Sequence, residues 1–110
     1  MNGKLEFQNA VHKDWQIFSV KGHVDTVTSP QLEKATGEVL QANEKVALNM
    51  SEMDYISSAG LRTLLRLAKQ AKRDNKKFVF FGANAMIKEI FDSAGMDRFF
   101  TIYETIEDLP

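Results

Sequence analysis

Two adjacent serines, Ser57 and Ser58, are the residues of this chain whose type and position best suit chemistry. They stand in the stretch MDYISSAGLR, where an apolar segment gives way to residues with the spacing of a helix. A serine at a helix start commonly accepts a hydrogen bond from a free backbone N–H group. The same N–H groups and the helix dipole stabilise an anion, so an exposed serine there also suits phosphorylation. Ser58 can therefore both cap the helix and serve as a site of regulatory phosphorylation.

No other group of residues predicts an enzyme or a metal site. His12 and His23 do not have the spacing that would place two ligands on one helical face. The glycine-rich patterns that hold phosphates and the GxSxG pattern of serine hydrolases do not occur. The carboxylates of Asp25, Glu52 and Asp54 could pair in space, but sequence alone does not support a hydrolase. We therefore predict no catalytic residue, no metal ligand and no cofactor.

Composition predicts one globular domain over residues 1–110. The chain has 44% hydrophobic and 26% charged residues, and 110 residues suffice for one core but not for two. A formal net charge of −1 argues against binding to nucleic acid or to an anionic membrane through bulk charge. The basic residues between 66 and 77 alternate with apolar ones, which is typical of the solvent-facing side of a helix.

The same composition indicates where the protein works. The chain has no cysteine, no apolar run long enough to cross a bilayer and no signal-peptide pattern at its start. We expect a cytoplasmic protein that does not insert into a membrane and does not contact nucleic acid directly.

The elements that must position the serines follow the order β-β-α-β-α-β-α-β. Aromatic and β-branched runs predict strands at 4–9, 15–21, 45–50, 78–82 and 99–103. Apolar spacing of three and four predicts helices at 30–42, from the serines to about 74, at 84–94, and a last turn at 105–109. We expect Gly22 to end the second strand, Ser29 to cap the first helix and SEMDYISSAG to form a loop. This order predicts an α/β fold with a mixed four- to five-stranded sheet and three to four helices packed mainly on one face.

The serine segment resembles that of the STAS domain family, and within it the anti-sigma factor antagonists. The stretch LNMSEMDYISSAGLRTLL, residues 48–65, is similar to the strand, loop and helix around the regulatory serine of that family. GHVDTVTSPQL, residues 22–32, is similar to the family's loop before the first helix, and SAGMDRFFTIYETIEDL to its end. The resemblance covers almost the whole chain and implies a single STAS-like domain.

This resemblance implies a binding protein without catalysis of its own. Its partners would be an anti-sigma factor that is an ATP-dependent serine kinase and a PP2C-type phosphatase. Binding of the kinase would release a sigma factor, by partner switching in bacterial transcription regulation. Ser58 matches the phosphoacceptor of the family, and Ser57 is a second candidate because it stands where many members have Asp. The implied partner-binding residues, in a chain that is a monomer when free, are Asp25, Thr26, Ser57, Ser58, Ala59, Gly60 and Arg62.

A second interpretation comes from a different class of protein. The chain could be a constitutive STAS adaptor or scaffold subunit of a transport or signalling assembly, in which Ser57 and Ser58 only cap the helix. For the phosphorylation-controlled antagonist, we expect Ser58 to be exposed at the helix start. We also expect Asp25 to lie at the same edge of the sheet, because both loops follow strands that end there.

Overall fold

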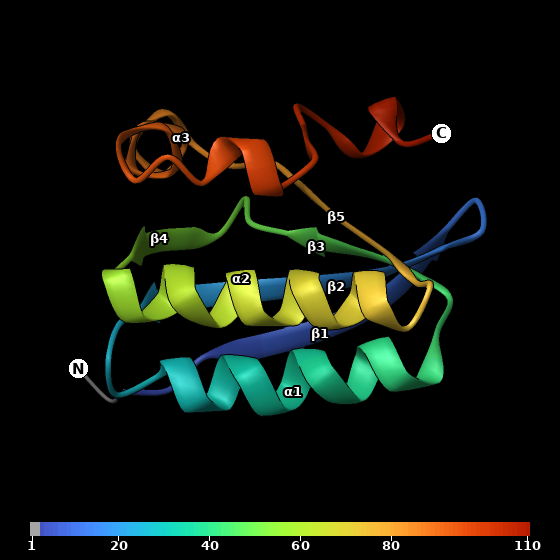
Figure 1. Cartoon of the computed structure of the whole chain (residues 1–110), viewed down its shortest axis with the longest axis horizontal. Helices are drawn as coiled ribbons and strands as arrows, with labels where there is room; N and C mark the ends of the chain where they lie inside the picture. The colour runs from blue at the N-terminus through green and yellow to red at the C-terminus, as the bar shows by residue number, and fades with distance from the viewer. Residues whose placement is uncertain (1–2) are drawn as a thin grey trace.

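A mixed sheet forms the centre of the protein, and the computed structural model describes it for residues 3–110 (Figure 1). The strands pair in the order β1-β2-β3-β5-β6, and β4 also pairs with β2. Their bounds are β1 (Glu6–His12), β2 (Trp15–Val24), β3 (Lys45–Asn49), β4 (Met53–Ile56), β5 (Lys77–Phe81) and β6 (Ile102–Tyr103). The helices are α1 (Ser29–Ala42), α2 (Ser58–Arg73) and α3 (Ala85–Ser93), with two short 3-10 helices, η1 (Asp97–Phe99) and η2 (Ile106–Asp108). β1 is antiparallel to β2, and the other pairs are parallel.

The two faces of the sheet build two separate cores, because successive strand side chains point to opposite sides. The larger core takes side chains from the strands and from all three α-helices, among them Phe18, Leu48, Phe80, Leu32, Leu64 and Ile87. The smaller core consists of Trp15, Ile17, Ala47, Val79, Phe81 and Leu109, with η2 packed against it. α1 and α2 run side by side across the larger core (Figure 1). The expected α/β fold with helices mainly on one face is therefore confirmed.

The sheet has six strands within the described residues, not four to five, because the expected loop after β3 contains β4. Gly22 does not end β2. It has a φ of +129°, the register shifts between Gly22 and His23, and the strand continues to Val24. The continuation beyond this bulge pairs in parallel with β4, through His23 with Tyr55 and Val24 with Ile56. This extra pairing carries the chain directly to the serines.

The start of α1 also differs from the expectation. Ser29 is the first residue of the helix, and Thr28 occupies the N-cap position without a side-chain cap hydrogen bond. The Ser29 hydroxyl instead donates to the Asp25 carbonyl oxygen at 2.6 Å. The prediction that Ser29 caps α1 is wrong; Ser29 is the first residue of the helix and Pro30 the second.

Toward the carboxyl terminus, the helix expected at 84–94 is confirmed as α3, with Asn84 as its N-cap. Asn84 Oδ1 accepts from the Ile87 N–H at 2.8 Å, and Gly95 follows the helix with a φ of +69°. The expected strand at 99–103 is shorter, because its first residue, Phe99, belongs to η1 and only Ile102 and Tyr103 pair with β5. None of the helices within residues 3–110 combines the length and the apolar character needed to span a membrane.

Candidate partner-binding site at the start of helix α2

The site forms where two neighbouring parallel strands end. β2 ends at Val24 and β4 at Ile56, and the Ser57 N–H donates to the Val24 carbonyl oxygen at 2.8 Å. The loop that begins at Asp25 and the first turn of α2 therefore lie at the same edge of the sheet. The expectation that Asp25 and Ser58 lie at the same edge of the sheet is confirmed. The reason is that the carboxyl ends of neighbouring parallel strands meet at one edge.

The two serines have different environments. Ser57 is the N-cap of α2, with extended backbone, and its Oγ accepts from the Gly60 N–H at 3.3 Å. Ser58 is the first residue of the helix and is exposed, and its hydroxyl forms no hydrogen bond with any residue from 3 to 110. Capping thus falls to Ser57, and the idea that Ser58 is also the cap is wrong. The Ser58 hydroxyl is free to react.

Gly60 holds the first turn of α2 against the strand ends. It is buried, and a Cβ atom at this position would lie 2.7 Å from Ile56 Cγ1 and 2.7 Å from Val24 Cγ1. Only a residue without a side chain lets the helix start this close to the sheet. Gly60 therefore contributes packing to the site and presents no surface, whereas Ala59 beside it is half-buried.

Asp25 shapes the neighbouring loop. Its Oδ1 accepts from the Thr28 N–H at 3.1 Å and from the Val27 N–H at 2.9 Å. The hydrogen bond from the Thr28 N–H is the main reason that the pKa of Asp25 is lowered from its ordinary value. Thr28 closes the turn by accepting from the Asp25 N–H at 2.9 Å and donating to the His23 carbonyl oxygen at 2.8 Å. This turn leaves Thr26 exposed, together with Val27, which is 68% exposed and which the sequence did not single out.

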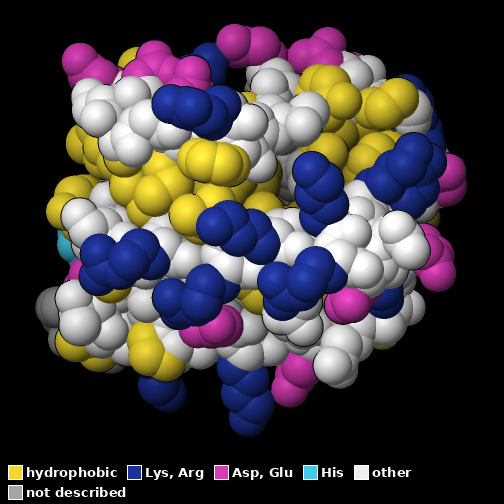
Figure 2. All heavy atoms as spheres, in the orientation of Figure 1, with side chains coloured by type: hydrophobic (Ala, Val, Ile, Leu, Met, Phe, Trp, Pro, Cys, Tyr) yellow, Lys and Arg dark blue, Asp and Glu magenta, His cyan; other side chains and the backbone are white. Residues whose placement is uncertain are grey.

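A groove of about 220 Å³ joins this loop to α1 and α2. Its lining residues are Thr26, Ser29, Pro30, Glu33, Ala59, Arg62, Thr63 and Arg66. Arg66 crosses it, with Nη2 at 2.8 Å from Glu33 Oε1, and this hydrogen bond lowers the pKa of Glu33. Arg62, four residues after Ser58, forms no ion pair within residues 3–110. Lysine and arginine side chains form a row along α2 in the space-filling view (Figure 2).

An aromatic pair borders the other side of the site. The His23 and Tyr55 rings stack with centroids 4.6 Å apart, and His23 Nδ1 lies 3.3 Å from Asp54 Oδ1. The carboxylates of Asp54 and Asp25 therefore have different partners. Asp54 lies against His23, whereas Asp25 accepts hydrogen bonds from backbone N–H groups. The sequence missed this pair because it depends on the bulge and on β4. Among residues 3–110, no three His, Asp or Glu side chains gather as a metal site would require.

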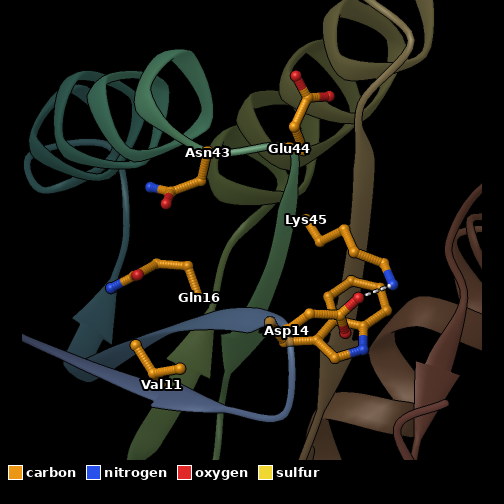
Figure 3. A pocket seen from close by; sticks show the side chains of 7 residues that line it. Val11, Asp14, Gln16, Asn43, Glu44 and Lys45 are labelled. Carbon is orange, nitrogen blue, oxygen red and sulfur yellow. Dashed lines mark hydrogen bonds and ion pairs between the residues drawn. The ribbon is translucent and has the colours of Figure 1, made fainter.

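A hollow separate from this site lies at the other end of the sheet (Figure 3). It measures about 310 Å³ and is lined by Val11, Asp14, Trp15, Gln16, Asn43, Glu44 and Lys45. Lys45 Nζ lies 2.7 Å from Asp14 Oδ2 and 5.0 Å from the centroid of the Trp15 ring. Trp15 begins β2, whereas Ser57 and Ser58 lie where β2 ends. The hollow is therefore separate from the serine site, and its ion pair is satisfied internally.

Comparisons with known proteins agree with the family that the serine segment resembles and with the observed α/β fold. The family model described as the STAS domain matches residues 6–109. The chain is similar to BtrV of Bordetella bronchiseptica, which carries the name of an anti-sigma factor antagonist, with 30% identity over 92 residues that cover 83% of this chain and 79% of BtrV.

Two solved structures share the fold. One is the crystal structure of an anti-sigma factor antagonist from Mycobacterium paratuberculosis, with a TM-score of 0.82, 22% identity, and coverage of 98% of this chain and 92% of that one. The other is the Bacillus cell fate determinant SpoIIAA in its phosphorylated form, with a TM-score of 0.67, 14% identity, and coverage of 94% and 95%. The chain therefore belongs to the STAS domain family, in which its relative BtrV bears the name of an anti-sigma factor antagonist.

Proposed function

We propose that this protein is an anti-sigma factor antagonist whose binding to an anti-sigma factor is controlled by phosphorylation of Ser58. The observation that carries the proposal is the exposed Ser58 hydroxyl, free of hydrogen bonds within residues 3–110, beside a separate capping serine. Ser57 is the weaker candidate acceptor, because its hydroxyl already accepts the Gly60 N–H. The name of its relative BtrV supports the same function.

The proposed partners follow from this role. The anti-sigma factor acts as the serine kinase that transfers phosphate from ATP to Ser58, and a PP2C-type phosphatase removes it. The protein itself, taken as one domain over residues 1–110 and a monomer when free, supplies no catalytic group. Since sigma factors work with RNA polymerase, the proposed location is the cytoplasm. The surface offered to the partner consists of Thr26, Ser57, Ser58, Ala59 and Arg62, with Asp25 and Gly60 as supports.

Phosphorylation would act locally on this surface. A phosphate adds about −1.5 to −2 charges at neutral pH. In the free protein, the N–H groups at the start of α2 and the guanidinium of Arg62 one turn later would stabilise that charge. Within a partner interface, the same charge has to lose water, which weakens binding. A tenfold loss of affinity needs only about 1.4 kcal/mol, so no refolding is required.

Incubation with the cognate anti-sigma factor kinase and ATP tests the proposal. We expect intact-mass measurement to find one added phosphate, about 80 Da, on the wild type and on Ser57→Ala, and none on Ser58→Ala. Titration of the same kinase should find that Ser58→Ala retains affinity and that Ser58→Asp loses it. Gln8→Glu, on the exposed edge strand β1, is the control for added charge and should bind as the wild type. Equal affinity of the Asp and Ala variants at position 58 would favour the constitutive adaptor instead.

A further inference from the structure

Positive charge is segregated on helix α2. Its sequence, SAGLRTLLRLAKQAKR, contains five Lys and Arg residues and no Asp or Glu, although the whole chain has a net charge of −1. Arg62, Arg66, Lys69 and Arg73 follow one another at spacings of four, three and four residues. This spacing places them along one side of the helix, and Figure 2 shows Lys and Arg side chains in a row along α2.

Most of these cations have no carboxylate partner. Arg66 is paired with Glu33 on α1. Within the described part of the chain, Arg62, Lys69 and Arg73 form no ion pair, and all three are exposed. Like charges on one helix side repel each other mildly. The unpaired row is therefore available to an acidic partner.

An exposed aromatic side chain lies next to the row. Phe99, on η1, is 51% exposed. Lys69 Nζ lies 6.0 Å and Arg98 Cζ 5.9 Å from the centroid of its ring. Figure 2 shows hydrophobic side chains between the row on α2 and the segment above it, with positive side chains on both borders. We call the surface formed by Arg62, Lys69, Arg73, Arg98 and Phe99 the basic strip.

We propose that the basic strip binds an acidic segment of the anti-sigma factor, with carboxylates facing Arg62, Lys69 and Arg73 and an apolar side chain covering Phe99. This inference rests on the proposed function. Charge complementarity supports an acidic occupant, and the half-exposed ring in the middle of the cations requires an apolar contact that a bare polyanion lacks. The net charge of −1 gives the whole molecule no long-range attraction for a nucleic acid or an anionic membrane, whereas a short acidic segment of a protein meets only the positive charges of the strip.

The basic strip begins with Arg62, one helical turn after Ser58. Phosphorylation of Ser58 would therefore affect the strip directly. A phosphate on Ser58 would attract the Arg62 guanidinium, since residues four apart on a helix are neighbours. The carboxylate of the partner would then lose its first contact on the strip. Phosphorylation would thus both introduce a charge into the interface and remove a cation from the partner.

Calorimetric titration of the cognate anti-sigma factor tests the strip. The variant with Lys69→Glu and Arg73→Glu should bind at least about tenfold more weakly than the wild type, and the difference should be larger at low salt. Phe99→Ala should also weaken binding several-fold. Lys34→Glu, which reverses one exposed charge on α1 outside the strip, is the control for a charge reversal elsewhere and should bind within about twofold of the wild type. Circular dichroism melts check that each variant is folded.

The outcomes separate the two proposals. A wild-type chain that does not bind its anti-sigma factor overturns the proposed function and this inference together. A wild type that binds, with a charge-reversed variant of the strip that binds equally well, overturns only the inference. The inference also fails if the reversal leaves that binding intact but abolishes binding to phosphatidylserine vesicles or to duplex DNA, because the strip would then serve a different ligand.

Discussion

The hydroxyl of Ser57 accepts a hydrogen bond from the Gly60 N–H at 3.3 Å, while that of Ser58, one residue later, is exposed and free within the described residues. The difference comes from backbone geometry, because the N-cap residue has extended backbone that turns its side chain back over the helix start. Ser58 already has helical geometry and cannot reach the same N–H groups. One serine therefore caps the helix, and its neighbour keeps an exposed hydroxyl that takes no part in the cap.

Alanine substitutions at the two serines should separate these roles in the free protein. Ser57→Ala removes the cap, so its free energy of unfolding should fall by about 1 kcal/mol. Ser58→Ala removes an exposed hydroxyl and should change the same quantity by less than about 0.5 kcal/mol. Urea unfolding followed by circular dichroism measures both. A larger loss at Ser58 than at Ser57 would show that the capping assignment is reversed.

The elements around the site are held together by short contacts between backbone and side chain. The first turn of α2 lies on the ends of β2 and β4, since Gly60 has no Cβ. The loop before α1 keeps its form because the Asp25 carboxylate accepts from the N–H groups of Thr28 and Val27. A change in either contact moves a whole element and, with it, the side chains of the proposed binding surface.

Gly60→Ala should destabilise the protein, although alanine favours helices. The new Cβ would lie 2.7 Å from Ile56 and from Val24, so α2 has to shift away from the strands. We expect a loss of about 1–3 kcal/mol in urea unfolding. Gly37→Ala in α1 is the control: no atom lies within 4 Å of its Cβ position, and stability should rise by about 0.5–1 kcal/mol. Effects of the same sign would contradict the close contact of α2 with the sheet.

The Asp25 turn should make stability depend on pH. Hydrogen bonds from the backbone lower the pKa of Asp25 in the folded protein, so folding favours its carboxylate. The resulting stabilisation is present above the unfolded pKa, about 4, and is lost as the pH falls through the lower folded pKa. The side-chain amide introduced by Asp25→Asn keeps an oxygen acceptor and does not titrate.

Urea unfolding of the wild type and Asp25→Asn at several pH values measures this effect. The difference in stability between the two proteins should be constant above about pH 5 and should shift against the wild type below about pH 4. Other carboxylates titrate in both proteins and cancel in the difference. A difference that does not vary with pH would mean that the turn does not favour the charged form of Asp25.

In the whole molecule, the two faces and the two ends of the sheet carry different groups of residues. The end where β2 and β4 stop carries the serines, the Asp25 turn and the start of the basic strip. The face opposite the α-helices is closed by the last residues, where Lys13 Nζ donates to the Leu109 carbonyl oxygen at 2.7 Å and Trp15 Nε1 to that of Pro110 at 3.3 Å. The smaller core and the proposed recognition site therefore lie in separate parts of one small protein.

Leu109→Ala tests this separation. Leu109 is 1% exposed in the smaller core, so its truncation should lower the free energy of unfolding by about 2–4 kcal/mol. The phosphorylation rate of Ser58, measured with the cognate kinase below the melting temperature, should stay at the wild-type value. A kinase rate that falls in parallel with stability would show that the carboxyl-terminal closure and the serine site are coupled.

The sequence by itself determined the features that depend on neighbouring residues. The apolar spacing of α2, the Asn84 cap of α3 and the unbroken apolar run of β5 each carry a local signal, and the predicted elements agree with them to within a few residues. The position of Ser58 at a helix start follows from the same local pattern. So does the shared edge of Asp25 and Ser58, once both preceding strands are known to be parallel.

Only the tertiary structure decided the features that depend on distant partners. β4 has four residues, and its two central ones, Asp54 and Tyr55, are both exposed. Buried and exposed residues therefore do not alternate along it, and the sequence does not indicate a strand. Its strand conformation comes from pairing with β2. Gly22 looked like the end of a strand because nothing local indicates a bulge that β4 stabilises. The burial of Gly60 and the approach of Phe99 to Lys69 likewise join segments far apart in the chain. Local periodicity and caps are encoded in short windows, whereas pairing and close packing exist only once the chain has folded.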